Sequence, residues 1–243
     1  MKKNIIRLAL VYLISLIAVG TFWFFFHRTE LQIFPLEEKT QTSVYSDIKE
    51  GGSSTARILR QDSILNFEVE LHSGTEHPFA GVLLPLSKQK ETFTKAKNFS
   101  GFDSVAILFR SPTPKISLIL FARDPKAAQI GDIFSLRPQT LSIEASPAYK
   151  ETRIALSELE TPLLWFDKHK IQEDRDLYLD EISFIGIESA KGTLLGIPAE
   201  IEIKGIRFFG KNRAVDFGSL LALLIFTGAF VLGLRRFYDQ NAH

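Results

Sequence analysis

Residues 98–124 read NFSGFDSVAILFRSPTPKISLILFARD, and this stretch decides the fold class. Residues 105–109 and 116–121 are short runs rich in β-branched, aromatic and aliphatic side chains, a composition typical of buried strands. Between them lies Ser111-Pro112-Thr113-Pro114, and two prolines this close together interrupt any regular element. The stretch therefore predicts two strands joined by a turn.

Six further segments have the same character or alternate apolar and polar residues with a period of two. They are residues 55–59, 64–71, 80–86, 153–156, 182–187 and 201–209. Helical signals are limited to residues 157–160, with Ser157 as N-cap, and to residues 124–128. About eight strands without a helix long enough for a parallel crossover predict an all-β fold, an antiparallel jelly-roll β-sandwich.

Both ends of the chain carry long apolar runs. Residues 8–26 are 19 consecutive residues without a charge, and residues 217–234 are another 18. At about 1.5 Å per residue, each nearly spans a hydrocarbon core of roughly 30 Å. The first run ends in bulky phenylalanines and offers no small-residue cleavage site, so we interpret it as an uncleaved signal anchor. Ala229 and Gly233 form a small-xxx-small pair that suits close packing of the two spans.

Basic residues predict the orientation of these spans. The outer flanks carry five basic residues: Lys2, Lys3, Arg7, Arg235 and Arg236. The inner flanks carry fewer, so both termini are expected in the cytoplasm of a two-pass protein of the cell (inner) membrane. The predicted organisation is a cytoplasmic N-terminus with the first helix (1–28), a periplasmic or extracellular β-sandwich domain (29–216), a second helix (217–234) and a short cytoplasmic tail (235–243).

Composition excludes several classes of function. With 29 Lys+Arg against 28 Asp+Glu, the net charge of +1 lacks the basic field that nucleic-acid binding needs. The absence of cysteine excludes disulfides, thiolate metal sites and a cysteine nucleophile. No P-loop, G-x-G-x-x-G, G-x-S-x-G or HExxH motif is present, so the sequence gives no support for an enzyme.

Several patterns occur in an order that resembles a known fold family. They are VYSDIKEGGSSTARI, ILNFEVEL, FAGVLLPL, NFSGFDSVAILFR, ISLILFARD, RIALSELETPLLWF and IEIKGIRFFG. Together they cover most of residues 42–210 and resemble the galactose-binding-like jelly roll of some carbohydrate-binding modules and of the complex I intermediate-associated protein family. The resemblance implies a β-sandwich that either binds a sugar or serves as an assembly factor, and the fold does not choose between these roles.

The same resemblance implies a structural calcium ion in many family members, with an acidic residue in the last strand. Here the corresponding stretch is Ile203-Lys204-Gly205-Ile206, where a lysine ammonium would repel a cation. Asp47, Glu50 and Glu202 still offer oxygen atoms. On balance we expect neither a calcium site nor any other metal or cofactor.

Trp165 is the leading candidate for ligand binding. It lies in PLLWFDKH, where an aromatic side chain stands beside Asp167, Lys168 and His169, a combination that suits stacking on a sugar ring with polar groups at its rim. Packing of the indole beneath the sandwich is the alternative, and both interpretations stay open. The other candidate ligand-binding residues are His169, Tyr149, Tyr178, Arg110 and Arg123. Arg110 and Arg123 would face a common groove if their strands formed a tight hairpin.

The functional hypothesis is a membrane-anchored, extracytoplasmic, non-enzymatic domain that binds a carbohydrate or glycan. A scaffold or assembly role with a membrane-protein partner is the alternative. The segment after Arg236 is too short to form an output domain, so a third expectation is that the chain is the sensory input of a longer receptor. The sequence identifies neither the ligand nor the oligomeric state.

Overall fold

The computed structural model describes residues 2–35, 41–87, 95–190 and 192–239. The chain divides into two compact units, residues 30–209 and the paired terminal segments 1–29 and 210–243. The elements in chain order are α1 (Lys2–Phe26), β1 (Arg28–Phe34), β2 (Ser43–Ser46), the 3-10 helix η1 (Asp47–Glu50), β3 (Thr55–Gln61), β4 (Leu65–Glu70), β5 (Ala80–Pro85), β6 (Phe102–Arg110), β7 (Lys115–Ala122), η2 (Ile133–Ser135), β8 (Arg137–Glu144), β9 (Lys150–Ala155), η3 (Leu156–Glu158), α2 (Leu163–His169), β10 (Ile182–Ser189), β11 (Ala199–Lys211) and α3 (Arg213–Asp239).

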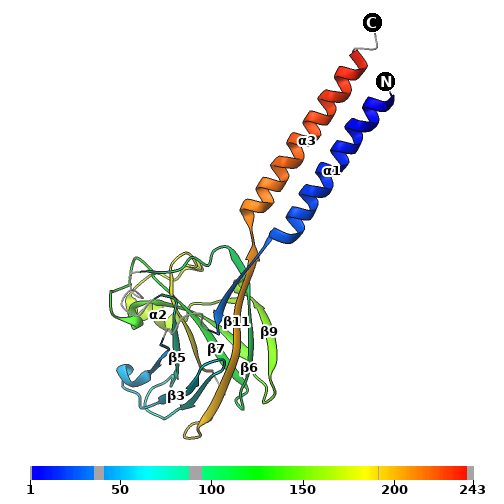
Figure 1. The fold of residues 1–243 in the computed structure, drawn as a ribbon. Coiled ribbons are helices and arrows are strands. Elements are labelled where there is room, and N and C mark those ends of the chain that lie inside the picture. The colour runs from blue at the N-terminus through cyan, green and yellow to red at the C-terminus, as the bar shows by residue number, and fades with distance from the viewer. Residues whose placement is uncertain (1, 36–40, 88–94, 191, 240–243) are drawn as a thin grey trace. The chain divides into compact units, whose positions relative to one another are not determined.

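The terminal unit is a pair of helices, α1 and α3, that lie side by side (Figure 1). Both are long and apolar enough to cross a membrane. Tyr12 stacks on Phe230 with ring centroids 4.5 Å apart, and its hydroxyl lies 3.1 Å from the Thr227 hydroxyl. A Cβ at Gly233 would lie 3.0 Å from a methyl carbon of Leu8, so this glycine lets the helices approach closely, as its spacing predicted.

Residues 30–209 form a sandwich of two antiparallel sheets. The six-stranded sheet has the order β3-β4-β11-β6-β9, and β1 also pairs with β11. The five-stranded sheet has the order β2-β5-β10-β7-β8. Consecutive strands pair at β3–β4 and β7–β8, but the other neighbours, such as β5 beside β10, are distant in sequence, which is the connectivity of a jelly-roll sandwich rather than a meander. The predicted fold class is confirmed.

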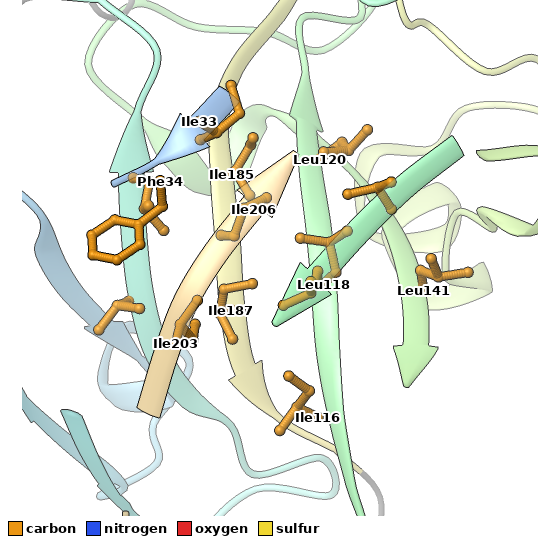
Figure 2. Packing of buried hydrophobic residues seen from close by; sticks show 14 of the residues in the cluster. Ile33, Phe34, Ile116, Leu118, Leu120, Leu141, Ile185, Ile187, Ile203 and Ile206 are labelled. Atoms are coloured by element: carbon orange, nitrogen blue, oxygen red, sulfur yellow. The ribbon is translucent and has the colours of Figure 1, made fainter. Parts of the chain in front are cut away.

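The main core fills the space between the two sheets. Figure 2 shows Leu118 and Leu120 of β7 and Ile187 of β10 directed toward Ile203 and Ile206 of β11. All five are at most 1% exposed. Alternate residues of these strands therefore point inward, and the intervening residues face outward, which gives the five-stranded sheet an outer face of its own.

A second apolar cluster covers the outer face of the five-stranded sheet. Its buried members are Leu83, Ile119, Phe121, Leu136 and Phe184. Because both faces of this sheet are covered, β5 is buried along its whole length, which explains its continuous apolar sequence. The outer face is therefore enclosed by other parts of the chain rather than left open to solvent.

All eight predicted strands are present, and the described residues contain three further strands that the sequence analysis missed. These are β1, β2 and β8, whose sequences RTELQIF, SVYS and RPQTLSIE mix charged or polar residues with apolar ones. The predicted turn at 157–160 is the 3-10 helix η3, one residue earlier. Residues 124–128 form a single turn closed by the Ala128 amide, which donates to the Asp124 carbonyl at 2.8 Å.

Candidate functional site

A cavity of about 530 Å³ lies against the outer face of the five-stranded sheet. Its volume is within the usual range of small-molecule sites. Strands β2, β7, β8 and β10, helix α2, and the segments around Glu50, Phe79 and Phe134 all contribute to its walls. The lining residues are Tyr45, Glu50, His77, Phe79, Ile119, Phe121, Ile133, Phe134, Leu136, Pro138, Thr140, Pro162, Leu163, Leu164, Trp165, Lys168 and Glu188.

A tyrosine and a glutamate from the sheet supply polar groups to this largely apolar cavity. The Tyr45 hydroxyl of β2 donates to Oε2 of Glu188 in β10 at 2.7 Å. Gly186 makes room for this pair. A Cβ there would lie 2.7 Å from the Phe121 ring and 2.9 Å from the Tyr45 hydroxyl. A side chain at position 186 would therefore displace the groups that shape the cavity.

The surroundings of this pair change its proton affinity. Burial raises the pKa of the Glu188 carboxyl to about 7, although the hydrogen bond from Tyr45 opposes the shift. Burial and the neighbouring Glu188 both raise the pKa of Tyr45 well above its ordinary value. Near neutral pH the cavity therefore contains a neutral tyrosine beside a carboxyl group that is close to half protonated. Such a pair can both donate and accept hydrogen bonds from a ligand.

Aromatic rings form a continuous wall beside the polar pair. Tyr45 lies 5.9 Å from both Phe79 and Phe121, and Phe79 lies 6.5 Å from Phe134, measured between ring centroids. The ammonium group of Lys168 lies 5.7 Å from the centroid of the Phe134 ring. The same ammonium group is 2.6 Å from a carboxylate oxygen of Glu50. One side of the cavity thus combines aromatic faces with an ion pair.

Trp165 lies on α2, a helix that the sequence analysis did not predict. Pro162 precedes the helix with φ −60°, and Lys170 ends it in the left-handed conformation with φ 54°. The residue is 6% exposed, as the packing interpretation requires, and it also lines the cavity, while its stacking on a ligand stays a prediction. His169 lies behind it, with ring centroids 4.8 Å apart, and its Nε2 is 3.2 Å from the Phe134 carbonyl.

A buried arginine packs against the aromatic residues of α2. The side chain of Arg137 is 1% exposed and pairs with Asp124 at 3.3 Å and with Asp174 at 2.6 Å. Its guanidinium group also lies 4.8 Å from the Phe166 ring and 4.7 Å from the Tyr178 ring. The hydrogen bond from Arg137 lowers the pKa of Asp174. These contacts hold the helix that carries Trp165.

The remaining sequence candidates lie elsewhere. Tyr178 packs against Arg137 rather than lining the cavity. Arg110 and Tyr149 contact each other and Glu202, and these residues belong to the six-stranded sheet or its border. Arg123 follows β7 and lies 3.8 Å from Glu181. The predicted common groove for Arg110 and Arg123 is wrong, because β6 and β7 lie in different sheets and form no hairpin.

The residues considered for calcium do not fit such an ion. Asp47 accepts hydrogen bonds from the Ser54 amide at 2.9 Å and the Ser54 hydroxyl at 2.8 Å, so protein donors occupy its oxygens. Glu50 pairs with Lys168, and Glu202 pairs with Arg110 in the other sheet. Among the described residues, no group of three or more His, Asp or Glu side chains is placed to hold a metal ion.

Sequence reasoning missed most of the cavity. Tyr45, Phe79, Phe134, Lys168 and Glu188 come from segments far apart in the chain, and only the fold brings them together. One signal was present in β10, whose sequence is ISFIGIES. Gly186 and Glu188 alternate with Ile185 and Ile187, so a glycine and an acid share one face of a strand that is otherwise apolar. That pattern indicates a polar group on a sheet face that other parts of the chain cover.

Comparisons with known proteins support the fold assignment. No protein-family model matches the chain, and no curated protein matches it. The family 11 carbohydrate-binding module of the cellulosomal cellulase Lic26A-Cel5E of Clostridium thermocellum is similar in structure, with a TM-score of 0.51 and 15% identity over 76% of this chain and 95% of the module. The family 11 module from the same organism in complex with a β-1,3-1,4-mixed-linked tetrasaccharide gives the same TM-score and identity, over 76% and 96% of the two chains.

These similarities show the fold alone, because the sequence identity is low. The expected resemblance to carbohydrate-binding modules is confirmed at that level, and the resemblance to complex I intermediate-associated proteins stays a prediction. Residues 30–209 are an antiparallel β-sandwich of the kind found in those modules, and the chain also contains two helices that are apolar enough to span a membrane.

Proposed function

We propose that this chain is a membrane-anchored, non-enzymatic domain that binds a carbohydrate in the cavity on the outer face of the five-stranded sheet. The observation that carries the proposal is the combination of aromatic rings with a partly buried carboxyl–hydroxyl pair in one cavity of about 530 Å³. The sandwich fold supports it, because the similar family 11 modules are carbohydrate-binding modules and one is in complex with a mixed-linked tetrasaccharide.

The chemistry of the lining suits a sugar ring. A pyranose has apolar C–H faces and hydroxyl groups around its edge. Phe79, Phe134 and Trp165 offer apolar aromatic surface to the faces. The Tyr45 oxygen can accept from a sugar hydroxyl, Glu188 can accept or, when protonated, donate, and the Glu50–Lys168 pair offers both at the rim. The proposed contacts therefore match both kinds of surface that a sugar presents.

The proposed setting is the outer surface of a cell membrane. Two apolar helices bracket the sandwich in sequence, and basic residues are concentrated at their outer flanks. This distribution favours cytoplasmic termini and an extracytoplasmic sandwich, in which the domain meets envelope or environmental glycans. Labelling of single cysteines introduced at Ser63 and near Arg236 with a membrane-impermeant maleimide tests the orientation. Only the Ser63 cysteine should react in intact cells.

The test measures binding of envelope and plant oligosaccharides to full-length protein in lipid nanodiscs. The panel of oligosaccharides includes a mixed-linked β-glucan fragment. Two tyrosines provide a matched pair of variants, because each donates its hydroxyl to a glutamate but only Tyr45 lines the cavity. Tyr45→Phe should weaken binding about tenfold, as expected for loss of one hydrogen bond worth about 1.4 kcal/mol, and Tyr149→Phe should not. Equal effects of both variants would contradict the proposed site.

A scaffold role is a second candidate, and one surface feature favours it. The loop between β10 and β11 exposes Leu194, Leu195 and Ile197, which are 66%, 52% and 53% exposed. Three large apolar residues this close on a surface are typical of a protein contact. A photo-crosslinking amino acid at position 194 in intact membranes tests this role. A defined protein adduct would support it, whereas adducts spread over many proteins would not.

A further inference from the structure

Polar and apolar groups line different parts of the cavity, and this segregation indicates the kind of ligand. The polar lining residues include Tyr45 of β2 and Glu188 of β10, which contact each other, and Glu50 of η1 and Lys168 of α2, which form an ion pair. The hydrocarbon side chains come from the segment around η2, the start of β8 and the start of α2: Ile133, Leu136, Pro138, Leu163 and Leu164. Helix α2 links the two parts, because Leu163 and Leu164 begin it and Lys168 lies near its end.

The register of the five-stranded sheet fixes this separation. Glu188 is paired with Ser117 of β7 on one side and with Gly81 on the other, and Gly81 is paired with Tyr45. Pro138 is paired instead with Phe121, four residues further along β7 than Ser117. Four residues of a strand span about 13 Å. The backbone positions of Glu188 and Pro138 are therefore further apart than the width of one sugar ring.

The apolar part is too poor in hydrogen-bonding groups for a second sugar. Ten of the seventeen described lining residues have hydrocarbon side chains, and Thr140 is the polar exception contributed by β8. A sugar hydroxyl buried there without a partner is unfavourable, whereas an alkyl or aryl group gains from leaving water. Leu163 and Leu164, 61% and 55% exposed, extend the apolar surface to the opening.

We infer that the ligand is a glycoside with an apolar aglycone, whose sugar contacts Tyr45 and Glu188 and whose alkyl or aryl group lies among Leu136, Pro138 and Leu164. This inference rests on the proposed carbohydrate binding and narrows it to an amphiphilic ligand. Glycolipid head regions and aryl glycosides share this chemistry, and the two sources differ in the shape of the aglycone.

The test measures dissociation constants of methyl, butyl, hexyl and phenyl β-glucosides and β-galactosides for full-length protein in nanodiscs, with empty nanodiscs as a correction for partitioning. Affinity should increase roughly fourfold for each added methylene, so hexyl glycosides should bind about 16-fold more tightly than butyl glycosides. A preference for the phenyl over the hexyl glycoside identifies an aryl aglycone, and the reverse identifies an alkyl one. Hexanol alone should bind at least tenfold more weakly than the hexyl glycoside.

Two leucine variants localise the effect. Leu164→Asp places a charge at the apolar part of the cavity, and Leu194→Asp is the matched control because Leu194 is equally exposed but does not line the cavity. Leu164→Asp should remove the dependence on chain length, whereas Leu194→Asp should retain it. Methyl glycoside binding without any chain-length dependence would overturn the inference and leave the proposed function intact. Failure of every glycoside and every panel oligosaccharide would overturn both.

Discussion

Tyr45 and Glu188 are 143 positions apart in the chain, yet the tyrosine hydroxyl lies 2.7 Å from the carboxyl group of the glutamate. The contact crosses β5, since β2 and β10 flank that strand in the sheet. Gly81 of β5 has no side chain to intervene between them. This pair supplies polar groups to the cavity. The strand order of the sandwich brings the two residues together and so forms the proposed site.

Glu188→Gln should reduce the pH dependence of stability. Burial raises the pKa of Glu188 from 4.5 to about 7, so folded protein retains a proton that unfolded protein releases in this window. Stability therefore decreases as the pH rises from 4.5 to 7, and the loss is complete above pH 7. The shift corresponds to on the order of 3 kcal/mol, or roughly 5–10 °C in Tm. Melting curves at pH 5 and pH 8 should show a smaller difference in the variant, and an unchanged difference would argue against a buried acid.

Gly186→Ala should close the polar part of the cavity. A Cβ at this position would lie within 3 Å of both Phe121 and the Tyr45 hydroxyl, so the tyrosine must move away from Glu188. Carbohydrate affinity should fall at least tenfold, on the order of 1.4 kcal/mol. Gly101→Ala is the matched control, because nothing lies within 4 Å of a Cβ there. Equal affinities of the two variants in the same binding assay would place the ligand elsewhere.

Arg137→Met should destabilise the sandwich strongly. The substitution leaves Asp124, which is 0% exposed, without its cationic partner and removes the contact with Asp174. Removing one partner of a buried ion pair costs about 3–5 kcal/mol, which corresponds to a decrease of roughly 10 °C in Tm. Arg153→Met is the control, since that side chain is 56% exposed and its ion pair contributes less than about 1 kcal/mol. Similar melting temperatures for both variants would contradict a supporting role for Arg137.

Trp165→Ala should lower both stability and affinity, because the indole packs in the protein and also lines the cavity. Removal of a buried aromatic side chain costs about 3–5 kcal/mol, so melting of the variant should begin at clearly lower temperature. Trp165→Phe retains most of the packing and should restore most of the Tm. Binding is then compared at a temperature where all three proteins are folded. Affinity that is unaffected in folded Trp165→Ala would assign the residue to packing alone.

The strands were predictable because the local sequence pattern is enough to indicate them. The runs around Phe67, Ile107, Leu118 and Ile185 combine β-branched or aliphatic residues with an alternation that a buried strand requires. Strand β8 was missed because Arg137 and Gln139 are polar yet buried, and Arg137 is paired with Asp124 from another segment of the chain. The polar residues at those positions predicted a loop, but tertiary contacts stabilise this segment as a strand.

The candidate site was only partly predictable, for a different reason. Trp165 was identified from its neighbours in sequence, and it does line the cavity. Arg110 and Tyr149 were selected by residue type, yet they belong to a cross-strand cluster with Glu202 on the six-stranded sheet. Nothing in a linear pattern assigns a residue to one of two sheets, because that assignment depends on the strand order of the whole sandwich.

Tryptophan fluorescence gives the most direct test of carbohydrate binding in the cavity. The chain has two tryptophans, so full-length Trp23→Phe in nanodiscs reports on Trp165 alone. Titration with the oligosaccharide and glycoside panel should give a saturable change in emission for one class of sugar, and Gly186→Ala in the same background should abolish it. A folded protein whose Trp165 emission responds to no member of the panel would contradict the account.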